Sequence, residues 1–199
     1  MEIHTIRLSD IRSSEGKLIA CADKQRREKA LRFLHKDDRL RSLAAGYLMK
    51  KFLPHFSEDC LCLGKDGKPF LKGGPAFSVS HGGEYVVLAI DENAEGVGVD
   101  VEPIADMEVY RPILQSYATP NEQRAIGNDA LKAVWIWTRK ESLYKTYGEG
   151  VSDFLELPET LEDRVMFFGA ECFLKSWQED GHMFSAALRG TNKMRLHRK

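Results

Sequence analysis

Two carboxylates stand two positions apart at the end of the stretch Gly96-Val97-Gly98-Val99-Asp100-Val101-Glu102. The alternating valines favour a strand, and side chains two residues apart in a strand point to the same face. Asp100 and Glu102 therefore share one face, where their charges repel unless a cation lies between them. Mg²⁺ binds carboxylate oxygens and usually keeps waters that a phosphate can replace. The pair alone leaves two interpretations open, a magnesium site or a solvated acidic strand end that runs into a turn at Pro103.

A third carboxylate, Glu141, lies in the segment 129–147, whose apolar spacing and following Gly148 predict a helix. One stripe of this helix has its members at helical spacing: Val134, Thr138, Glu141 and Lys145. A Glu–Lys pair four residues apart is usually a surface pair worth a few tenths of a kcal/mol. Trp135 and Trp137 beside the stripe predict a more buried setting for this pair.

The segment 77–83 carries groups that can contact a phosphate. Its alternation predicts a strand over 77–80, and His81-Gly82-Gly83 predicts a turn. Ser80 and His81 directly before two glycines allow backbone N–H groups to approach a phosphate closely. The alternative is an ordinary hairpin turn, since Ser and His are common before such turns.

Charge is distributed unevenly along the chain. Residues 1–51 contain 13 Lys or Arg against 7 Asp or Glu, whereas residues 91–106 contain six acids and no base. This asymmetry suits a phosphorylated ligand held by cations and by a metal; the alternative is ordinary solvated surface.

Composition places the chain among globular proteins. It has 199 residues, 43% of them hydrophobic and 30% charged, with a net charge of −1, so one large domain or two small ones can form a core. The close pair Cys60-x-Cys62 lacks a second pair at zinc-binding spacing, and we expect reduced thiols. Since residues 1–10 lack a signal-peptide pattern and no apolar run has membrane-spanning length, we expect a cytoplasmic protein without membrane or nucleic-acid partners.

The remaining pattern predicts mixed α and β elements. In chain order they are a strand at 2–8, helices at 23–35 and 37–53, a hairpin turn at Asp66-Gly67, a strand at 85–90, an irregular segment from 104 to 118, a helix opened by a capping box at 119–122, and strands at 164–169, 171–177 and 182–188. Asp37 or Asp38 is expected to cap the second helix and Pro54 to end it. Residues 83–90 and 181–188 share a pattern, which indicates a duplication into two α+β halves.

Three motifs in this order resemble the signature of the 4′-phosphopantetheinyl transferase superfamily. They are Phe77-Ser78-Val79-Ser80-His81, then Gly98-Val99-Asp100-Val101-Glu102, then Trp137-Thr138-Arg139-Lys140-Glu141-Ser142-Leu143-Tyr144-Lys145. The family pattern reads Gly-[Val/Ile]-Asp-x-Glu, followed about forty residues later by Trp-x-x-Lys-Glu-[Ser/Ala]-x-x-Lys. The length, the helix leading into 35–38 and the segment 148–151 are similar to the monomeric surfactin-synthetase-activator (Sfp) type. The resemblance covers about residues 20–155.

The resemblance implies an α+β fold, a pseudo-two-fold monomer of two similar subdomains. Residues 1–102 would form the N-terminal half with basic helices that bind coenzyme A phosphates, and residues 103–199 the C-terminal half with the Trp-x-x-Lys-Glu helix. The active site would lie between the halves.

It also implies a reaction, in which phosphopantetheine moves from coenzyme A to a serine of an apo acyl or peptidyl carrier protein and adenosine 3′,5′-bisphosphate is released. Asp100, Glu102 and Glu141 would bind Mg²⁺, and Glu141 could also take the serine proton. Lys145 would face the pyrophosphate.

Further residues match family positions that hold coenzyme A. Ser80, His81 and Lys68, the last in Gly67-Lys68-Pro69, would contact its phosphates. Lys29 and Arg41 would hold the 3′-phosphate, with Lys24 a further candidate.

One segment departs from the family pattern, which often reads Phe-[Ser/Thr]-x-x-Glu before the short helix. In this chain Tyr117 is displaced by one residue from that aromatic position. Glu122 aligns with the family glutamate and could assist as a base, although the capping box at Thr119 explains it equally.

Two alternative functions are left open. One is a coenzyme A-binding module without catalysis, which would require loss of a metal carboxylate or of Lys145. The other is a metal-dependent phosphodiesterase, in which water attacks instead of a serine. Because carrier proteins of this family tend to be acidic, a basic or apolar groove is expected between the halves. The pathway, whether fatty acid, polyketide or nonribosomal peptide, is left open by the sequence.

Overall fold

The computed structural model describes residues 1–64, 67–147, 157–190 and 194–198. The elements of the first part are β1 (Glu2–Arg7), α1 (Leu8–Ile11), η1 (Arg12–Ser14), α2 (Glu15–Cys21), α3 (Lys24–Leu31), α4 (Lys36–Phe52), η2 (Glu58–Cys60), β2 (Leu61–Leu63), β3 (Pro69–Leu71), β4 (Ala76–Gly82) and β5 (Tyr85–Asp91). Those of the second part are β6 (Gly96–Pro103), α5 (Met107–Tyr117), α6 (Pro120–Ile126), α7 (Ala130–Tyr144), β7 (Arg164–Phe167), β8 (Ala170–Glu179), β9 (His182–Arg189) and β10 (His197–Arg198).

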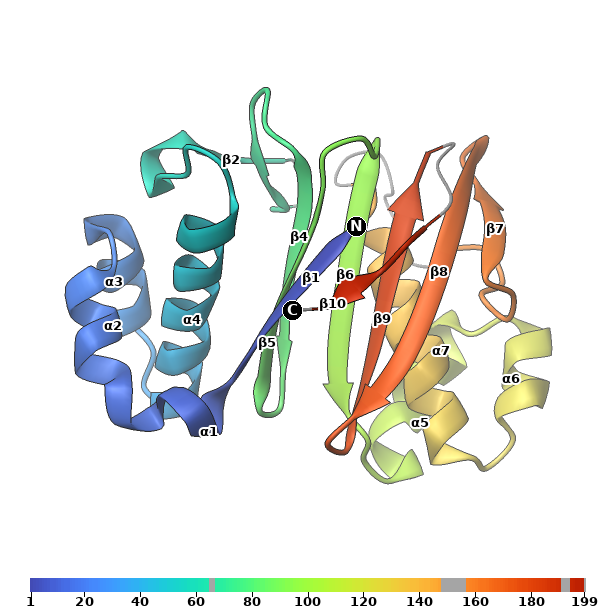
Figure 1. Ribbon diagram of the computed structural model, residues 1–199. Coiled ribbons are helices and arrows are strands. Elements are labelled where there is room, and N and C mark those ends of the chain that lie inside the picture. The colour runs from blue at the N-terminus through green and yellow to red at the C-terminus, as the bar shows by residue number, and fades with distance from the viewer. Residues whose placement is uncertain (65–66, 148–156, 191–193, 199) are drawn as a thin grey trace.

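Two four-stranded sheets form the centre of the molecule, and helices lie on both outer sides (Figure 1). The first sheet has the order β10-β1-β5-β4 and the second the order β6-β9-β8-β7. All pairings in them are antiparallel except that of β1 with β10. The predicted α+β class is thereby confirmed. The predicted boundary at residue 102 falls within β6, whose ladder partner is β9.

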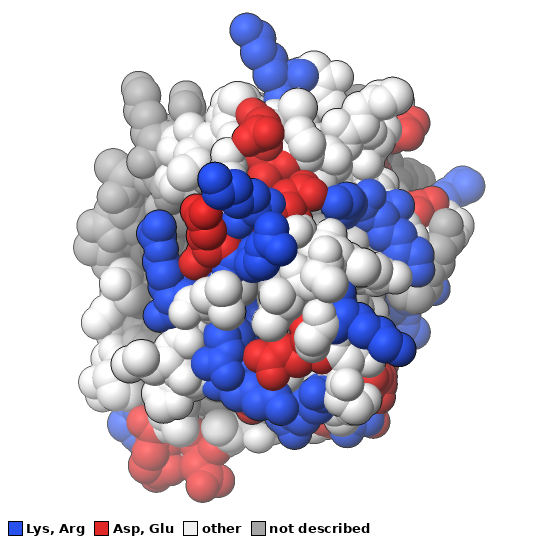
Figure 2. All heavy atoms as spheres, turned by 90° about the vertical axis from the view of Figure 1, so that its left-hand side faces the viewer, with Lys and Arg blue, Asp and Glu red and all other residues white. Residues whose placement is uncertain are grey.

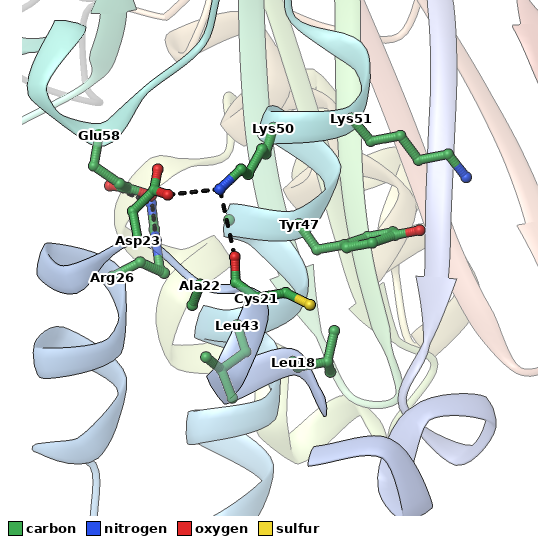
Figure 3. A pocket seen from close by; sticks show the side chains of 11 residues that line it. Leu18, Cys21, Ala22, Asp23, Arg26, Leu43, Tyr47, Lys50, Lys51 and Glu58 are labelled. Carbon is green, nitrogen blue, oxygen red and sulfur yellow. Dashed lines mark hydrogen bonds and ion pairs between the residues drawn. The ribbon is translucent and has the colours of Figure 1, made fainter. Parts of the chain in front are cut away.

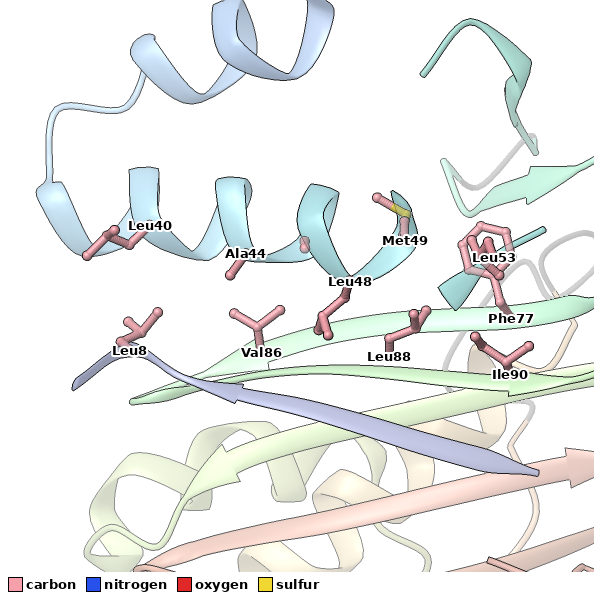
Figure 4. Packing of buried hydrophobic residues seen from close by; sticks show 11 residues of the cluster. Leu8, Leu40, Ala44, Leu48, Met49, Leu53, Phe77, Val86, Leu88 and Ile90 are labelled. Carbon is pink, nitrogen blue, oxygen red and sulfur yellow. The ribbon is translucent and has the colours of Figure 1, made fainter. Parts of the chain in front are cut away.

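Alternation along β5 explains this layered arrangement. One set of its side chains, Val86, Leu88 and Ile90, packs against Leu40, Ala44, Leu48 and Met49 of α4, as Figure 4 shows. The intervening set, Tyr85, Val87 and Ala89, packs against the valines of β6 and against Phe184, Ala186 and Leu188 of β9. Full burial of a Leu or Val side chain contributes about 1.5–3 kcal/mol. Both faces of β5 are thus buried, which its unbroken apolar sequence requires.

The valines of β6 face the first sheet, so the alternate positions face α7. These alternate positions are Gly96, Gly98, Asp100 and Glu102. The strand therefore presents its two carboxylates to the helix that carries Glu141.

Several predicted elements are confirmed with small shifts of their ends. They include β1, the helices near 23–35 and 37–53, β5, the helix near 129–147 and the three C-terminal strands. The capping box is present, because Thr119 accepts from the Glu122 N–H and Glu122 accepts from the Thr119 N–H. The predicted turn at Asp66 and the predicted cap Gly148 lie outside the described residues.

Two predictions of secondary structure were wrong. The segment 104–118 contains α5, because Tyr110 and Leu114 bury one helical face despite Pro112 inside the helix. His81 and Gly82 belong to β4, paired with Val86 and Tyr85, so the turn begins later than expected.

The cap of α4 also differs from the prediction. The N-cap residue is His35 without a side-chain cap, while Asp37 and Asp38 lie in the first turn, where acids still complement the helix dipole. All four cysteines are within the described ranges and are unpaired thiols, as expected. Within those ranges, no helix has the length and apolar character needed to cross a membrane.

Candidate functional site

Two glycines allow α7 to lie directly on β6. A Cβ atom on Gly98 would stand 1.8 Å from the Ser142 carbonyl oxygen, and one on Gly96 would stand 2.1 Å from that of Thr146. Only glycine fits where two backbones approach so closely. The sequence carries a signal of this approach, because the two glycines occupy alternate positions of one strand.

Side chains from β4, β6 and α7 meet around Asp100, which is 3% exposed. Its Oδ1 accepts from the Ser80 hydroxyl at 2.7 Å and lies 2.7 Å from Lys145 Nζ. Lys145 Nζ also donates to Ser80 Oγ at 3.1 Å and lies 3.7 Å from Glu141 Oε2. Four predicted site residues, Ser80, Asp100, Glu141 and Lys145, are therefore brought together.

Acidic charge is in excess at this cluster. Burial, and then the charge of Asp100, raises the pKa of Glu102 to about 7. Burial likewise raises the pKa of Glu141 to about 7; Asp100 adds to the shift and Lys145 opposes it. Burial acts to lower the pKa of Lys145, but Asp100 and Glu141 raise it above its ordinary value. One ammonium thus stands among three carboxyl groups, and the cluster favours additional positive charge.

The fit to a divalent metal is partial in this arrangement. Across the described residues, no group of three or more His, Cys, Asp or Glu side chains is placed to hold a metal ion. The Lys145 ammonium stands beside two of the proposed ligands, Asp100 and Glu141. On the other hand, Asp100 Oδ2 is buried without a hydrogen-bond partner, and carboxylate oxygens are the donors that Mg²⁺ prefers. The donor set fits a hard cation provided that Lys145 withdraws.

Two adjoining cavities lead away from the cluster. The inner cavity, of about 200 Å³, is lined by residues that include Lys68, Glu141 and Lys145. The outer cavity, of about 260 Å³, is lined by residues that include Lys29, Arg41 and His81. They share walls at Gly67, Pro69 and Val79, and we call them together the basic groove.

The basic side chains assigned to the groove differ in their contacts and in their exposure. Arg41 donates to the Gly83 carbonyl from Nε at 3.2 Å and from Nη2 at 2.7 Å, and its Nη1 donates to Asp38 at 2.7 Å. Burial, and then the charges of Arg41 and Lys145, lowers the pKa of His81. Lys24 is exposed at the start of α3 and lines neither cavity of the groove.

Lys68 is occupied by main-chain acceptors. Its Nζ donates to the Val97 carbonyl at 3.0 Å and to the Lys145 carbonyl at the end of α7. Burial, and then the charges of Arg189 and Lys145, lowers its pKa to about 8. In this arrangement Lys68 joins β6 to the end of α7. To contact a phosphate, Lys68 would have to give up these two hydrogen bonds.

Glu122 does not join the cluster. It is 0% exposed and pairs at 3.0 Å with Lys140, which is also 0% exposed. Its carboxylate further accepts from the Thr119 N–H at 2.7 Å, and from the N–H and the hydroxyl of Thr160 at 2.7 and 2.9 Å. A carboxylate enclosed by these donors cannot reach a substrate hydroxyl, so the geometry does not support the predicted role of Glu122 as a base.

Two contacts of Glu102 did not follow from the sequence, those with Trp137 and with Tyr110. A hydrogen bond from Trp137 acts to lower the pKa of Glu102. Burial, and then the charges of Glu102 and Asp100, raises the pKa of Tyr110 to about 12. Tyr110 lies on α5, which was not expected, so no local signal pointed to it.

The N-terminal helices present a mixed surface, in which Lys and Arg alternate with Asp and Glu (Figure 2). A separate cavity of about 270 Å³ lies between α2, α3 and α4, with Leu18, Leu43 and Tyr47 among its walls (Figure 3). Ion pairs of Lys50 with Asp23 and of Arg26 with Glu58 border it. None of the predicted site residues lines this cavity.

Two family models match the chain. The model of the 4′-phosphopantetheinyl transferase superfamily matches residues 96–185, and that of the N-terminal part of 4′-phosphopantetheinyl transferases matches residues 12–93. These matches meet at the start of β6, and together they include the groove and the carboxylate cluster. The chain belongs to the 4′-phosphopantetheinyl transferase superfamily.

Relatives carry the same name. The chain is 30% identical over 138 residues to 4′-phosphopantetheinyl transferase gsp of Aneurinibacillus migulanus, an alignment that covers 64% of this chain and 56% of that protein. It is 26% identical over 137 residues to Sfp of Bacillus subtilis strain 168, which covers 64% of this chain and 61% of Sfp. It is also 26% identical over 203 residues to the transferase ffp of Bacillus subtilis, which covers 90% of this chain and 88% of ffp. Against gsp and Sfp, the chain thus spans less than two thirds of the relative's length.

Proposed function

We propose that this protein transfers 4′-phosphopantetheine from coenzyme A to a serine hydroxyl of an apo carrier protein and releases adenosine 3′,5′-bisphosphate. The observation that carries the proposal is the cluster of Ser80, Asp100, Glu141 and Lys145 at the inner end of the basic groove. An elongated ligand with phosphates near both ends of its nucleotide suits a groove with cations along its length and a site for a metal at its end.

Coenzyme A binding is assigned to the groove. Lys29, Arg41 and His81 would face the adenosine end with its 3′-phosphate, because they line the outer cavity. Ser80 and Lys145 would face the pyrophosphate, because they stand beside Asp100 at the inner end. Lys145, with 25% of its side chain exposed, can exchange its contact with Asp100 for one with a phosphate oxygen.

The proposed cofactor is Mg²⁺, held by Asp100, Glu102 and Glu141. When bound, it neutralises charge on the pyrophosphate and on the leaving phosphate. In the chain itself, Trp137 holds Glu102 through its hydrogen bond, and Lys145 retains a positive charge at working pH because its pKa is raised.

Glu141 is the proposed acceptor of the serine proton. It lies on the stripe of α7 that faces Asp100 and the inner cavity. Since one chain contributes residues from both sheets to this site, we propose that the monomer is active.

The deciding experiment mixes the purified protein with coenzyme A, Mg²⁺ and a panel of apo acyl and peptidyl carrier proteins. Mass spectrometry of the carrier is expected to show the gain of one phosphopantetheine, and a carrier whose acceptor serine is replaced by alanine should gain none. Cleavage of coenzyme A without carrier labelling would instead identify a phosphodiesterase. Binding without turnover would identify a non-catalytic module.

A further inference from the structure

Two hairpin tips, one from each sheet, meet at the same end of the molecule (Figure 1). The β4–β5 turn contains Gly83 and Glu84, and the β8–β9 turn contains Asp180 and Gly181. Asp180 and Gly181 have φ angles of 43° and 72°, as a tight two-residue hairpin requires. The contact between these tips joins the sheet that carries Ser80 to the sheet that carries Asp100.

His182 is the central residue of this contact. The backbone N–H of Glu84 donates to His182 Nε2 at 3.2 Å. Because Nε2 is an acceptor, the ring proton is on Nδ1, which lies 2.9 Å from the Asp180 carbonyl oxygen and donates to it. Asp180 in turn accepts from Tyr85 Oη at 3.0 Å and from Arg7 Nη1 at 2.7 Å. The imidazole ring is thus held on both nitrogens, and it is 7% exposed.

The ring also packs directly on Gly83. A Cβ atom at Gly83 would lie 2.3 Å from His182 Nε2, and the φ of Gly83 is +51°. The carbonyl oxygen of Gly83 is the acceptor of two Arg41 N–H groups, at 3.2 and 2.7 Å. His182 therefore fixes, from the second sheet, the peptide group that orients a guanidinium of the basic groove.

We infer that His182 is a positioning residue for Arg41, and through it for the phosphate that Arg41 binds. The inference rests on the proposed function, since it assigns Arg41 to the 3′-phosphate of coenzyme A. It goes beyond that function by placing a control of coenzyme A affinity at the junction of the hairpins, on the sheet opposite to the groove helices. His182 is not among the residues that line the two cavities of the basic groove.

Two amide variants test whether the hydrogen bond to Glu84 is required or whether any polar side chain at position 182 is sufficient. His182→Gln places an amide oxygen near the position of Nε2, whereas His182→Asn is too short to reach the Glu84 N–H. We expect His182→Asn to raise the KM for coenzyme A about tenfold with kcat within about twofold of wild type. We expect His182→Gln to restore KM to within about threefold.

A double-mutant cycle tests whether the effect passes through Arg41. In an Arg41→Gln background, His182→Asn should produce no further rise in KM. Isothermal titration with coenzyme A gives a second readout, and the loss of affinity should match the rise in KM. Gly83→Ala approaches the same contact from the other side and should reproduce the KM effect; it replaces His182→Asn if that variant does not fold.

The matched control is His197→Asn, which changes an exposed histidine on β10 and should leave KM unchanged. Thermal unfolding of each variant verifies that the folded state is populated during the assay. An unchanged KM in His182→Asn, a fall in kcat alone, failure of Gln to restore, or an equal effect in the Arg41→Gln background would each overturn the inference. Absence of carrier labelling by the wild type would instead refute the proposed function.

Discussion

Replacing Glu122 by Gln should destabilise the protein strongly while leaving the folded enzyme active. The carboxylate and its partner Lys140 are both 0% exposed and lie 3.0 Å apart. After the substitution, the Lys140 ammonium still donates to the Pro158 carbonyl, at 3.1 Å, but has lost its counter-charge. Breaking one side of a buried ion pair costs about 3–5 kcal/mol. For a chain of this length, each kcal/mol shifts Tm by about 2–4 °C, so we expect a Tm lowered by about 6–20 °C.

Replacing the partner, Lys140, should cost less stability. Lys140→Met leaves Glu122 with three donors, the N–H of Thr119 and the N–H and hydroxyl of Thr160. Hydrogen bonds to a charged group contribute about 1.5–3 kcal/mol each, so the remaining carboxylate stays compensated. We expect a loss of about 2 kcal/mol for Lys140→Met, below the usual cost of breaking a buried pair. The double variant should lose less than the sum of the single losses, because the two residues are in contact.

Thermal unfolding and carrier labelling, both measured on the same preparations, distinguish a structural from a catalytic Glu122. Loss of a general base lowers the rate about 10²–10⁴-fold, whereas a structural residue should change kcat less than about threefold at temperatures well below Tm. A Glu122→Gln variant with the wild-type Tm and a hundredfold lower kcat would refute this reasoning. So would additive losses in the double variant.

Further outcomes are expected for the carboxylate cluster and for the contact between α7 and β6. Asp100→Asn should abolish carrier labelling with a Tm within a few degrees of wild type, and wild-type turnover would disprove the metal assignment. Because the pKa values of Glu102 and Glu141 are raised to about 7 in the folded state, folding binds protons, and stability should fall as the pH rises from about 4.5 to 7, by up to about 3 kcal/mol for each group. Mg²⁺ should therefore raise Tm above pH 7 and have no effect below about pH 4.5; equal Tm shifts at both pH values, or none, would argue against the site. Gly98→Ala should lower both Tm and labelling, since its Cβ would strike the Ser142 carbonyl; an unperturbed variant would show that α7 can move freely.

The parts of the site that depend on local periodicity could be predicted from the sequence. Alternation in β6 placed Asp100 and Glu102 on one face, and helical spacing placed Glu141 and Lys145 on one stripe, because both follow from backbone geometry alone. Contacts between distant segments were beyond that reasoning. Nothing near Glu122 in the chain indicates Lys140 as its buried partner, and α5 was obscured by Pro112, whose effect is outweighed by the burial of Tyr110.

The position of Lys145 depends both on its spacing within α7 and on the packing of that helix against β6. As a residue four positions after Glu141 it predicts a weak surface pair, yet the glycines of β6 bring it to 2.7 Å from a carboxylate that is almost completely buried. In this arrangement Lys145 supplies the positive charge that the three carboxyl groups favour. With Mg²⁺ held by these carboxylates, the Lys145 ammonium would be available to the groove, where the proposed phosphates need a cation. Under the proposed function, the same side chain would stabilise the cluster before coenzyme A binds and would contact the pyrophosphate afterwards, so folding and binding would use one positive charge in turn.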